Sequence, residues 1–106
     1  MQVVWLDEAK VLLKKAISFG MLAFGEKAVI RFVDEIQKTD EQLSAFPLLG
    51  KIEPSLEGLG QEYRSLVIHR NYKVIYYIDD DIVFIASFWS TQCDPENLRS
   101  EIKKTR

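Results

Sequence analysis

Four basic side chains fall within ten residues in the second half of the chain: Arg64, His69, Arg70 and Lys73. Guanidinium and ammonium groups bind anions such as phosphate, and an imidazole can give or take a proton near neutral pH. No carboxylate lies within this ten-residue stretch. The spacing therefore indicates a site for an anionic partner, with His69 as a candidate acid or base.

The segment that carries these residues predicts three consecutive antiparallel strands. The runs Arg64–Ile68, Tyr72–Ile78 and Ile82–Trp89 are rich in β-branched and aromatic residues, and short polar links separate them. The first link, residues 69–71, is basic, and the second, residues 79–81, is acidic. The anionic partner is expected at the basic end. Nearly continuous apolar residues in the middle run predict a central strand that is covered on both faces.

Two helices are expected before these strands. Gln2–Trp5 predicts a first strand, and Asp7 is a candidate N-cap for a helix that stops at Gly25. A second helix is expected from Glu26 and ends at or before Phe46, because a proline follows that residue. The very short link between the helices predicts an antiparallel hairpin.

The expected fold class is α+β. A short C-terminal helix is expected after Asp94 and Pro95, which suit an N-cap and a first helical position. The order predicts an antiparallel helical hairpin packed on one face of a four-stranded, mainly antiparallel twisted sheet. The other face is expected to stay open, with cations near its rim. Residues 1–106 are expected to form one domain.

Composition narrows the function classes. The 106 residues carry a formal net charge of −2, which does not favour a general nucleic-acid binder, although a local basic patch could still act. Cys93 and His69 are the only residues of their types, so neither an internal disulfide nor a protein-only zinc site is expected, and no cofactor is indicated. Lysines interrupt the apolar run of residues 11–24, which is too short for a membrane span. A cytoplasmic location is the default expectation.

Five segments form a recognisable series when they are taken in order: Val3–Ala9, Arg31–Ile36, Phe46–Lys51, Tyr63–Ile68 and Tyr72–Tyr76. The third reads FPLLGK, the fourth YRSLVI and the fifth YKVIY. Together they resemble the RelE/ParE superfamily, the toxins of bacterial type II toxin–antitoxin modules. The resemblance covers nearly the whole chain and implies the same α+β fold.

The resemblance implies a toxin that a cognate antitoxin neutralises, but it leaves the target open. RelE-like members are ribosome-dependent endoribonucleases that cut mRNA, whereas ParE-like members poison DNA gyrase without cutting nucleic acid. A degenerate member could bind its antitoxin and poison nothing. Because these proteins share a fold, the choice depends on the site.

For an mRNA endoribonuclease, the resemblance implies phosphate clamps at Arg64 and Lys73. His69 is the candidate acid or base because an imidazole titrates near neutral pH. Each residue also has a structural interpretation. Arg64 could pair with Glu62 or with a helix carboxylate, and Lys73 could lie on a solvated face of the sheet. His69 and Arg70 lie in a turn, where polar residues are common.

The segment TQCDP, residues 91–95, departs from the family pattern. Members often carry two arginines where this chain has Gln92 and Cys93. Gln92 can hydrogen-bond a phosphate but cannot neutralise it. This departure favours the ParE-like alternative. Trp89 could stack on a base or fill a pocket of a target, or it could close the core as a lid.

The first helix has more large apolar residues than one buried face needs. Phe19, Met21, Leu22 and Phe24 are expected to bind the antitoxin, which would add a helix to the hairpin groove or a strand to a sheet edge. We interpret the chain as a type II toxin that inhibits a macromolecular target such as DNA gyrase. The alternative is an mRNA endoribonuclease that uses Arg64, His69 and Lys73.

Overall fold

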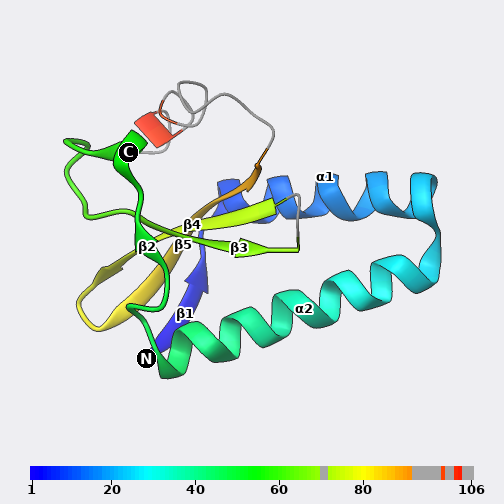
Figure 1. Cartoon of the computed structure of the whole chain (residues 1–106), viewed down its shortest axis with the longest axis horizontal. Helices are drawn as coiled ribbons and strands as arrows, with labels where there is room; N and C mark the ends of the chain where they lie inside the picture. Colours follow the sequence, from blue (N-terminus) through cyan, green and yellow to red (C-terminus); the bar gives the residue numbers. More distant parts are fainter. Residues whose placement is uncertain (70–71, 92–98, 100–101, 104–106) are drawn as a thin grey trace.

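The structure, a computed structural model, describes residues 1–69, 72–91, 99 and 102–103. Two long helices and a sheet form the body of the molecule (Figure 1). The elements are β1 (Gln2–Trp5), α1 (Asp7–Phe24), α2 (Glu26–Ala45), β2 (Lys51–Ile52), the 3-10 turn η1 (Pro54–Leu56), β3 (Arg64–Ile68), β4 (Tyr72–Asp79) and β5 (Ile82–Ser90). The predicted α+β class is confirmed.

The sheet has the strand order β1-β5-β4-β3-β2. Neighbouring strands from β2 to β5 are antiparallel, and β1 pairs in parallel with β5. β4 lies at the centre, as its continuous apolar sequence predicts. The sheet has five strands rather than four, because Lys51 and Ile52 pair with Ser65 and Arg64. A strand of two residues is too short to produce a periodic sequence pattern.

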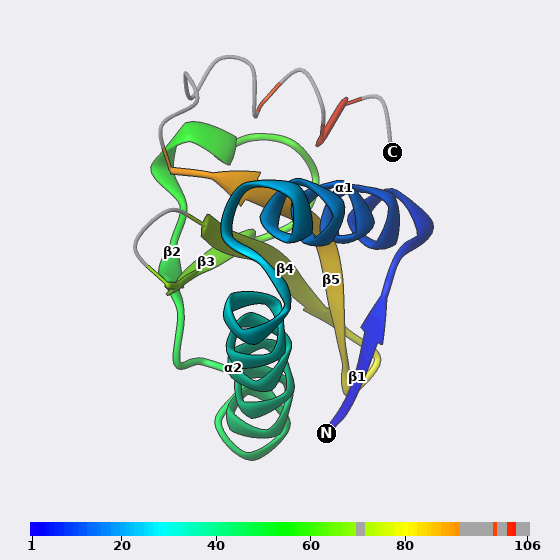
Figure 2. The same ribbon diagram turned by 90° about the vertical axis from the view of Figure 1, so that its right-hand side faces the viewer.

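The helices begin and end close to the predicted positions. α2 runs from Glu26 to Ala45 and stops before Phe46, as expected from the proline that follows. α1 already includes Asp7, and Leu6 takes the N-cap position, so the prediction of Asp7 as N-cap is wrong by one residue. Within the first turn, the Asp7 carboxylate still favours the helix N-terminus. The helices lie against the sheet, and their closed end projects past it (Figures 1 and 2).

The main core lies between the hairpin and the sheet. Ala9, Ile36 and Leu43 come from the helices, and they pack against Ile68, Val74, Tyr76, Val83, Ile85 and Phe88 from the strands. A β-bulge makes this possible in β5, since Ile75 pairs with Ser87 whereas Tyr76 pairs with Ile85. The extra residue, Ala86, reverses the alternation of the strand, so Ile85 and Phe88 both face the helices.

The second face of the sheet is covered, not open as expected. The connector between β2 and β3 supplies Leu56, Leu59 and Tyr63, which pack with Ile75 and Ala86, and Ile102 joins this cluster. This connector has no periodic pattern in the sequence, so its burial could not be predicted. The predicted C-terminal helix after Asp94 lies mostly outside the described residues.

Polar contacts fasten the end of α2 to β1. The Met1 amino group donates to the Ser44 carbonyl at 2.8 Å, and Trp5 Nε1 donates to Asp40 Oδ1 at 3.0 Å. Burial raises the pKa of Asp40, and the hydrogen bond from Trp5 opposes that effect. Among the described residues, neither helix is long and apolar enough to cross a membrane.

Candidate functional site

Arg64 lies at the start of β3 and is held in place by two acceptors. Its Nη1 donates to the Gly50 carbonyl at 2.8 Å, and its Nη2 contacts Glu62 Oε1 at 3.1 Å. The side chain is only 16% exposed. The ion pair with Glu62 is the structural interpretation of Arg64 given above as the alternative to a phosphate clamp. The guanidinium thus fastens the connector to the sheet.

Lys73 is paired with a carboxylate of the connector. Its Nζ lies 2.6 Å from Glu53 Oε1, and the side chain of Glu53 is 11% exposed. Burial alone would raise the pKa of Glu53, but the hydrogen bond and charge of Lys73, with help from Ser55, lower it below its ordinary value. Glu53 is therefore an ionised partner that neutralises Lys73.

The structure does not bring Arg64 and Lys73 together. Arg64 is opposite Tyr76 on the neighbouring strand, three residues beyond Lys73. Three residues of strand span about 10 Å, and an odd offset places two side chains on opposite faces of a sheet. Arg64 therefore shares the helix side with Tyr76, and Lys73 lies on the connector side.

His69 follows β3 in a left-handed conformation, with φ of 52°. Its ring meets Phe32 of α2 edge-on, with centroids 6.4 Å apart. His69 therefore faces the helical hairpin rather than Lys73. Arg70 and Gln92, the other predicted target-binding polar residues, lie outside the described residues.

Trp89 packs against the cluster on the connector side of the sheet. It is half-buried and lies opposite Lys73 on the neighbouring strand. Its buried Nε1 has no hydrogen-bond partner in the described part of the chain. In this position Trp89 covers part of the core on the connector side. A target-binding role for Trp89 stays a prediction.

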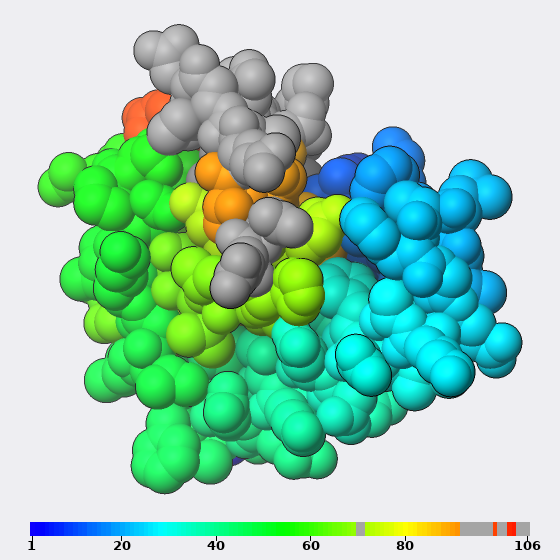
Figure 3. Space-filling view, turned by 45° about the vertical axis from the view of Figure 1, so that its right-hand side comes forward, coloured from blue at the N-terminus to red at the C-terminus, as the bar shows by residue number. Residues whose placement is uncertain are grey.

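A groove of about 430 Å³ lies where α1, α2 and the β3–β4 turn meet (Figure 3). Its lining is almost entirely apolar: Ala16, Phe19, Gly20 and Phe24 from α1, Ala28, Val29 and Phe32 from α2, His69 after β3 and Tyr72 at the start of β4. A Cβ added to Gly20 would lie 3.3 Å from Val29 Cγ2, so the small residue permits the close approach of the helices. We call this feature the hairpin groove.

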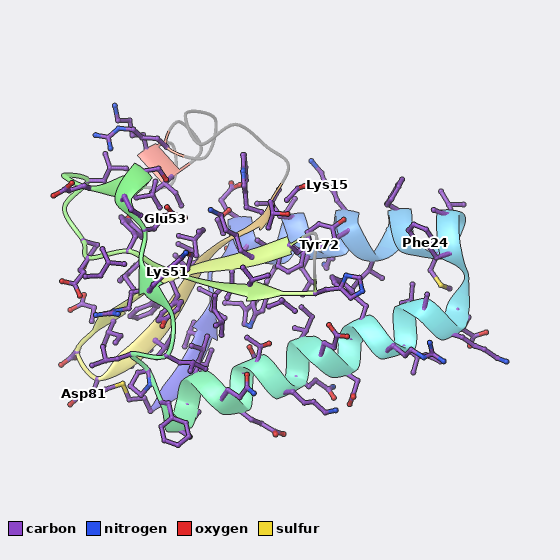
Figure 4. The ribbon with its side chains drawn as sticks, in the orientation of Figure 1. Lys15, Phe24, Lys51, Glu53, Tyr72 and Asp81 are labelled. Carbon is purple, nitrogen blue, oxygen red and sulfur yellow. The ribbon has the colours of Figure 1, made fainter. Side chains whose placement is uncertain are left out.

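Large apolar side chains are exposed beside the hairpin groove. Phe19 is 59% exposed, Phe24 71% and Leu22 91%, and Met21 and Ile30 are exposed as well. Figure 4 places Phe24 at the closed end of the hairpin, far from Glu53. These residues lack a covering layer because the hairpin extends beyond the sheet. An exposed apolar cluster of this kind is typical of a protein-binding surface.

The sequence identified only part of this surface. Phe19, Leu22 and Phe24 were predicted to bind a partner, and the structure places all three at the closed end. The sequence did not indicate that Ala28, Val29 and Phe32 of α2, together with His69, line the hairpin groove. The small residues Gly20 and Ala28, at positions where two helices meet, were a signal that could have indicated a groove.

The sequence profile described as "ParE toxin of type II toxin-antitoxin system, parDE" matches residues 3–95. The chain belongs to this family. It is thus a ParE-like toxin of a type II toxin–antitoxin system, and membership implies a cognate antitoxin partner.

A solved structure supports the fold assignment. The structure titled "Chromosomal ParDE TA system from P. aeruginosa" includes a chain with a TM-score of 0.71 and 18% sequence identity to this one. The alignment covers 87% of this chain and 97% of that chain. No curated protein sequence matches this chain. At this level of identity, the structural likeness establishes the fold alone.

Proposed function

We propose that this toxin acts in the cytoplasm by binding a macromolecular target rather than by cutting RNA, with DNA gyrase as the first target to test. A cognate antitoxin neutralises it by covering the closed end of the hairpin. The proposal combines family membership with the geometry of the candidate catalytic residues.

The placement of Arg64 and Lys73 carries the choice between binding and cleavage. Cleavage at a phosphodiester needs cations and an acid–base group around one phosphate. In the described residues, Arg64 and Lys73 lie on opposite faces of the sheet, and each is held by a carboxylate. His69, the third candidate residue, faces the hairpin groove instead. A shared phosphate site would require both ion pairs to break.

The first experiment separates the two targets. Purified toxin is added to a gyrase supercoiling assay and, separately, to ribosomes that are translating a defined mRNA. Inhibition of supercoiling with intact mRNA is the expected result. Ribosome-dependent cleavage of the mRNA without any effect on gyrase would overturn the proposal.

Two variants test the catalytic alternative directly. Arg64→Gln and Lys73→Met are expected to retain growth inhibition when expressed without antitoxin, provided that circular dichroism shows a native fold. Removal of a single charge-stabilising group from an active site commonly costs about 10²–10³ in rate. A comparable loss of toxicity by folded variants would favour the endoribonuclease.

The antitoxin surface has its own test. The candidate antitoxin is the protein encoded beside this gene, and the double variant Leu22→Asp/Phe24→Asp is expected to weaken its binding about 30-fold or more. Val11→Asp is a matched control, because Val11 is exposed on the same helix but lies three turns from Leu22. Unchanged affinity of the double variant would exclude this surface.

A further inference from the structure

A second cluster of exposed apolar side chains lies at the opposite end of the molecule from the closed end of the hairpin. It consists of Met1, Phe46, Leu48 and Leu49, whose exposed fractions are 44%, 67%, 64% and 48%. The N-terminus, the end of α2 and the β4–β5 turn all lie at this end of the molecule (Figures 1 and 2). Burial of large apolar side chains stabilises a protein, so a cluster left in water indicates a surface that binds a partner.

Hydrogen bonds hold the loop that carries this cluster in a fixed shape. The Leu49 N–H donates to the Phe46 carbonyl at 3.0 Å and closes a tight turn. The hydroxyl of the buried Tyr76 donates to the Pro47 carbonyl and accepts from the Gly50 N–H, both at 2.8 Å. A loop anchored to the core loses little conformational entropy when it binds, which favours its use as a docking surface.

Three carboxylates lie beside the cluster. Asp79, Asp80 and Asp81 connect β4 to β5, and all three are exposed. Asp80 and Asp81 have φ of 50° and 60°, as a tight hairpin turn requires. The turn accounts for residues that accept this conformation, but adjacent negative charges repel one another. Within the described residues none of the three takes part in an ion pair, so these charges are available to a cationic partner.

β1 brings the acidic turn next to the apolar cluster. Gln2 pairs in parallel with Ile82, and one residue back along both strands Met1 lies beside Asp81. The Met1 amino group also donates to the Ser44 carbonyl in the last turn of α2 at 2.8 Å. Figure 4 shows Asp81 at the opposite end of the molecule from the closed end of the hairpin. We call Met1, Phe46, Leu48, Leu49 and Asp79–Asp81 the basal surface.

We propose that the toxin docks on its macromolecular target through the basal surface, and that the target presents a basic segment with apolar side chains. The apolar loop buries those side chains, and the acidic turn faces the cations. The inference rests on the proposed function, because it takes DNA gyrase as the target. An enzyme that binds DNA carries basic surfaces that match phosphate groups, and the acidic turn is complementary to such a surface.

A basic protein segment fits the basal surface better than a second copy of this chain or nucleic acid. A symmetric dimer uses the same patch on both subunits, so two acidic turns would enter one interface and repel each other. Phosphates of nucleic acid would be repelled by the same carboxylates. Since the hairpin groove lies at the other end, an antitoxin there would exclude a large target by its bulk and not by covering the basal surface.

Two variants of the full chain test the basal surface. Phe46→Ser/Leu48→Ser removes large apolar side chains without a change in charge. Asp79→Asn/Asp80→Asn/Asp81→Asn removes three charges, and asparagine accepts the left-handed conformation of the turn.

Each variant has a matched control. Val11→Ser/Val67→Ser removes two other exposed apolar side chains, one on α1 and one on β3. Glu8→Gln/Glu26→Gln/Glu57→Gln removes three exposed carboxylates outside the basal surface. Binding of labelled toxin to purified DNA gyrase is measured by fluorescence anisotropy and compared with inhibition of supercoiling.

The double serine variant is expected to bind gyrase about 30-fold or more weakly than the native chain. The triple asparagine variant should bind about tenfold more weakly in about 50 mM NaCl, and this difference should shrink in about 500 mM NaCl, where surface charges are screened. Both variants should keep native affinity for the antitoxin encoded beside this gene, which shows that they are folded. Both controls should keep native affinity for gyrase.

Native gyrase affinity in both basal variants would overturn the inference and leave the proposed function intact. A loss in the double serine variant alone would overturn the basic character of the partner. Dimerisation in analytical ultracentrifugation that Phe46→Ser/Leu48→Ser abolishes would assign the surface to a second copy.

Failure of the proposed function gives a different result. If the native chain inhibits growth without binding gyrase, growth inhibition by the basal variants decides the inference. Retained inhibition overturns it, and a loss that spares both controls supports it. A native chain that neither binds gyrase nor inhibits growth would overturn both the inference and the proposed function.

Discussion

At the scale of single residues, Tyr76 joins the sheet to the segment that follows α2. Its hydroxyl accepts a hydrogen bond from the Gly50 N–H and donates one to the Pro47 carbonyl, both at 2.8 Å. Burial raises the pKa of Tyr76, so the hydroxyl keeps its proton. Gly50 also accepts from Arg64 through its carbonyl. These contacts give a physical role to the FPLLGK segment that the sequence singled out.

Gly50→Ala is expected to destabilise the fold by about 1–3 kcal/mol, the usual cost of overpacking. The added Cβ would lie 2.7 Å from both the Ser65 carbonyl and the Tyr76 hydroxyl. Urea denaturation measures the change in the free energy of unfolding. Leu49→Ala, a truncation of an exposed neighbour, is the control and should change stability little.

The Glu53–Lys73 pair predicts a pH-dependent contribution to stability. Because the folded state lowers the pKa of Glu53, the contribution is present above its ordinary value of 4.5 and is lost as the pH falls through the lowered value. Glu53→Gln should therefore cost about 1 kcal/mol at neutral pH. The difference in the free energy of unfolding between Glu53→Gln and the unsubstituted chain should disappear at acidic pH.

Urea denaturation at neutral and acidic pH checks this prediction. Glu57→Gln is the control, since the exposed Glu57 side chain forms no ion pair among the described residues. A difference in stability for Glu53→Gln that stays constant with pH would contradict the role of the charge.

The sequence pointed to Glu62 beside Arg64, but it did not indicate that Glu53 reaches Lys73. Glu53 lies twenty residues earlier, in a connector without regular periodicity.

At the scale of elements, the hairpin depends on one glycine. Gly25 ends α1 and precedes α2, with φ of 88° and ψ of 178°, a conformation that residues with a side chain rarely adopt. The helix ends were predictable because Gly25 and Pro47 are strong local signals. β2 was not predictable, since it exists only through its pairing with β3.

Gly25→Ala is expected to destabilise the chain by about 1–3 kcal/mol through backbone strain alone. No atom lies within 4 Å of the added Cβ, so steric contact contributes nothing. Gly20→Ala provides the contrast: it gains helix propensity but meets Val29 Cγ2 at 3.3 Å, and its net effect should be small. Thermal unfolding compares the two, and equal stability of the Gly25→Ala variant would refute the strain argument.

At the scale of the whole molecule, β1 joins the two ends of the described chain. Gln2 pairs with Ile82 and Trp5 with Ile85, so these contacts span about eighty residues. Helix and strand identities followed from local periodicity, but the parallel placement of β1 beside β5 did not. Side-chain alternation indicates which residues of a strand are buried, not which strand lies next to it.

Removal of residues 1–4 is expected to abolish cooperative unfolding. The deletion uncovers the edge of β5 and removes the Met1–Ser44 contacts that fasten the end of α2. Gln2→Ala is the control, since it trims an exposed side chain and leaves the backbone pairing intact. Near-ultraviolet circular dichroism during urea denaturation distinguishes a lost transition from a shifted one.

Because the hairpin extends beyond the sheet, loss of the antitoxin would shorten the lifetime of the free toxin in the cell. Without its partner, the molecule exposes Leu22 and Phe24 to water, and such patches promote aggregation. A partner that covers them removes this hazard and stabilises the native state by mass action. Toxin molecules released from the antitoxin would therefore aggregate or be degraded while they act. Their inhibition of growth would be self-limiting.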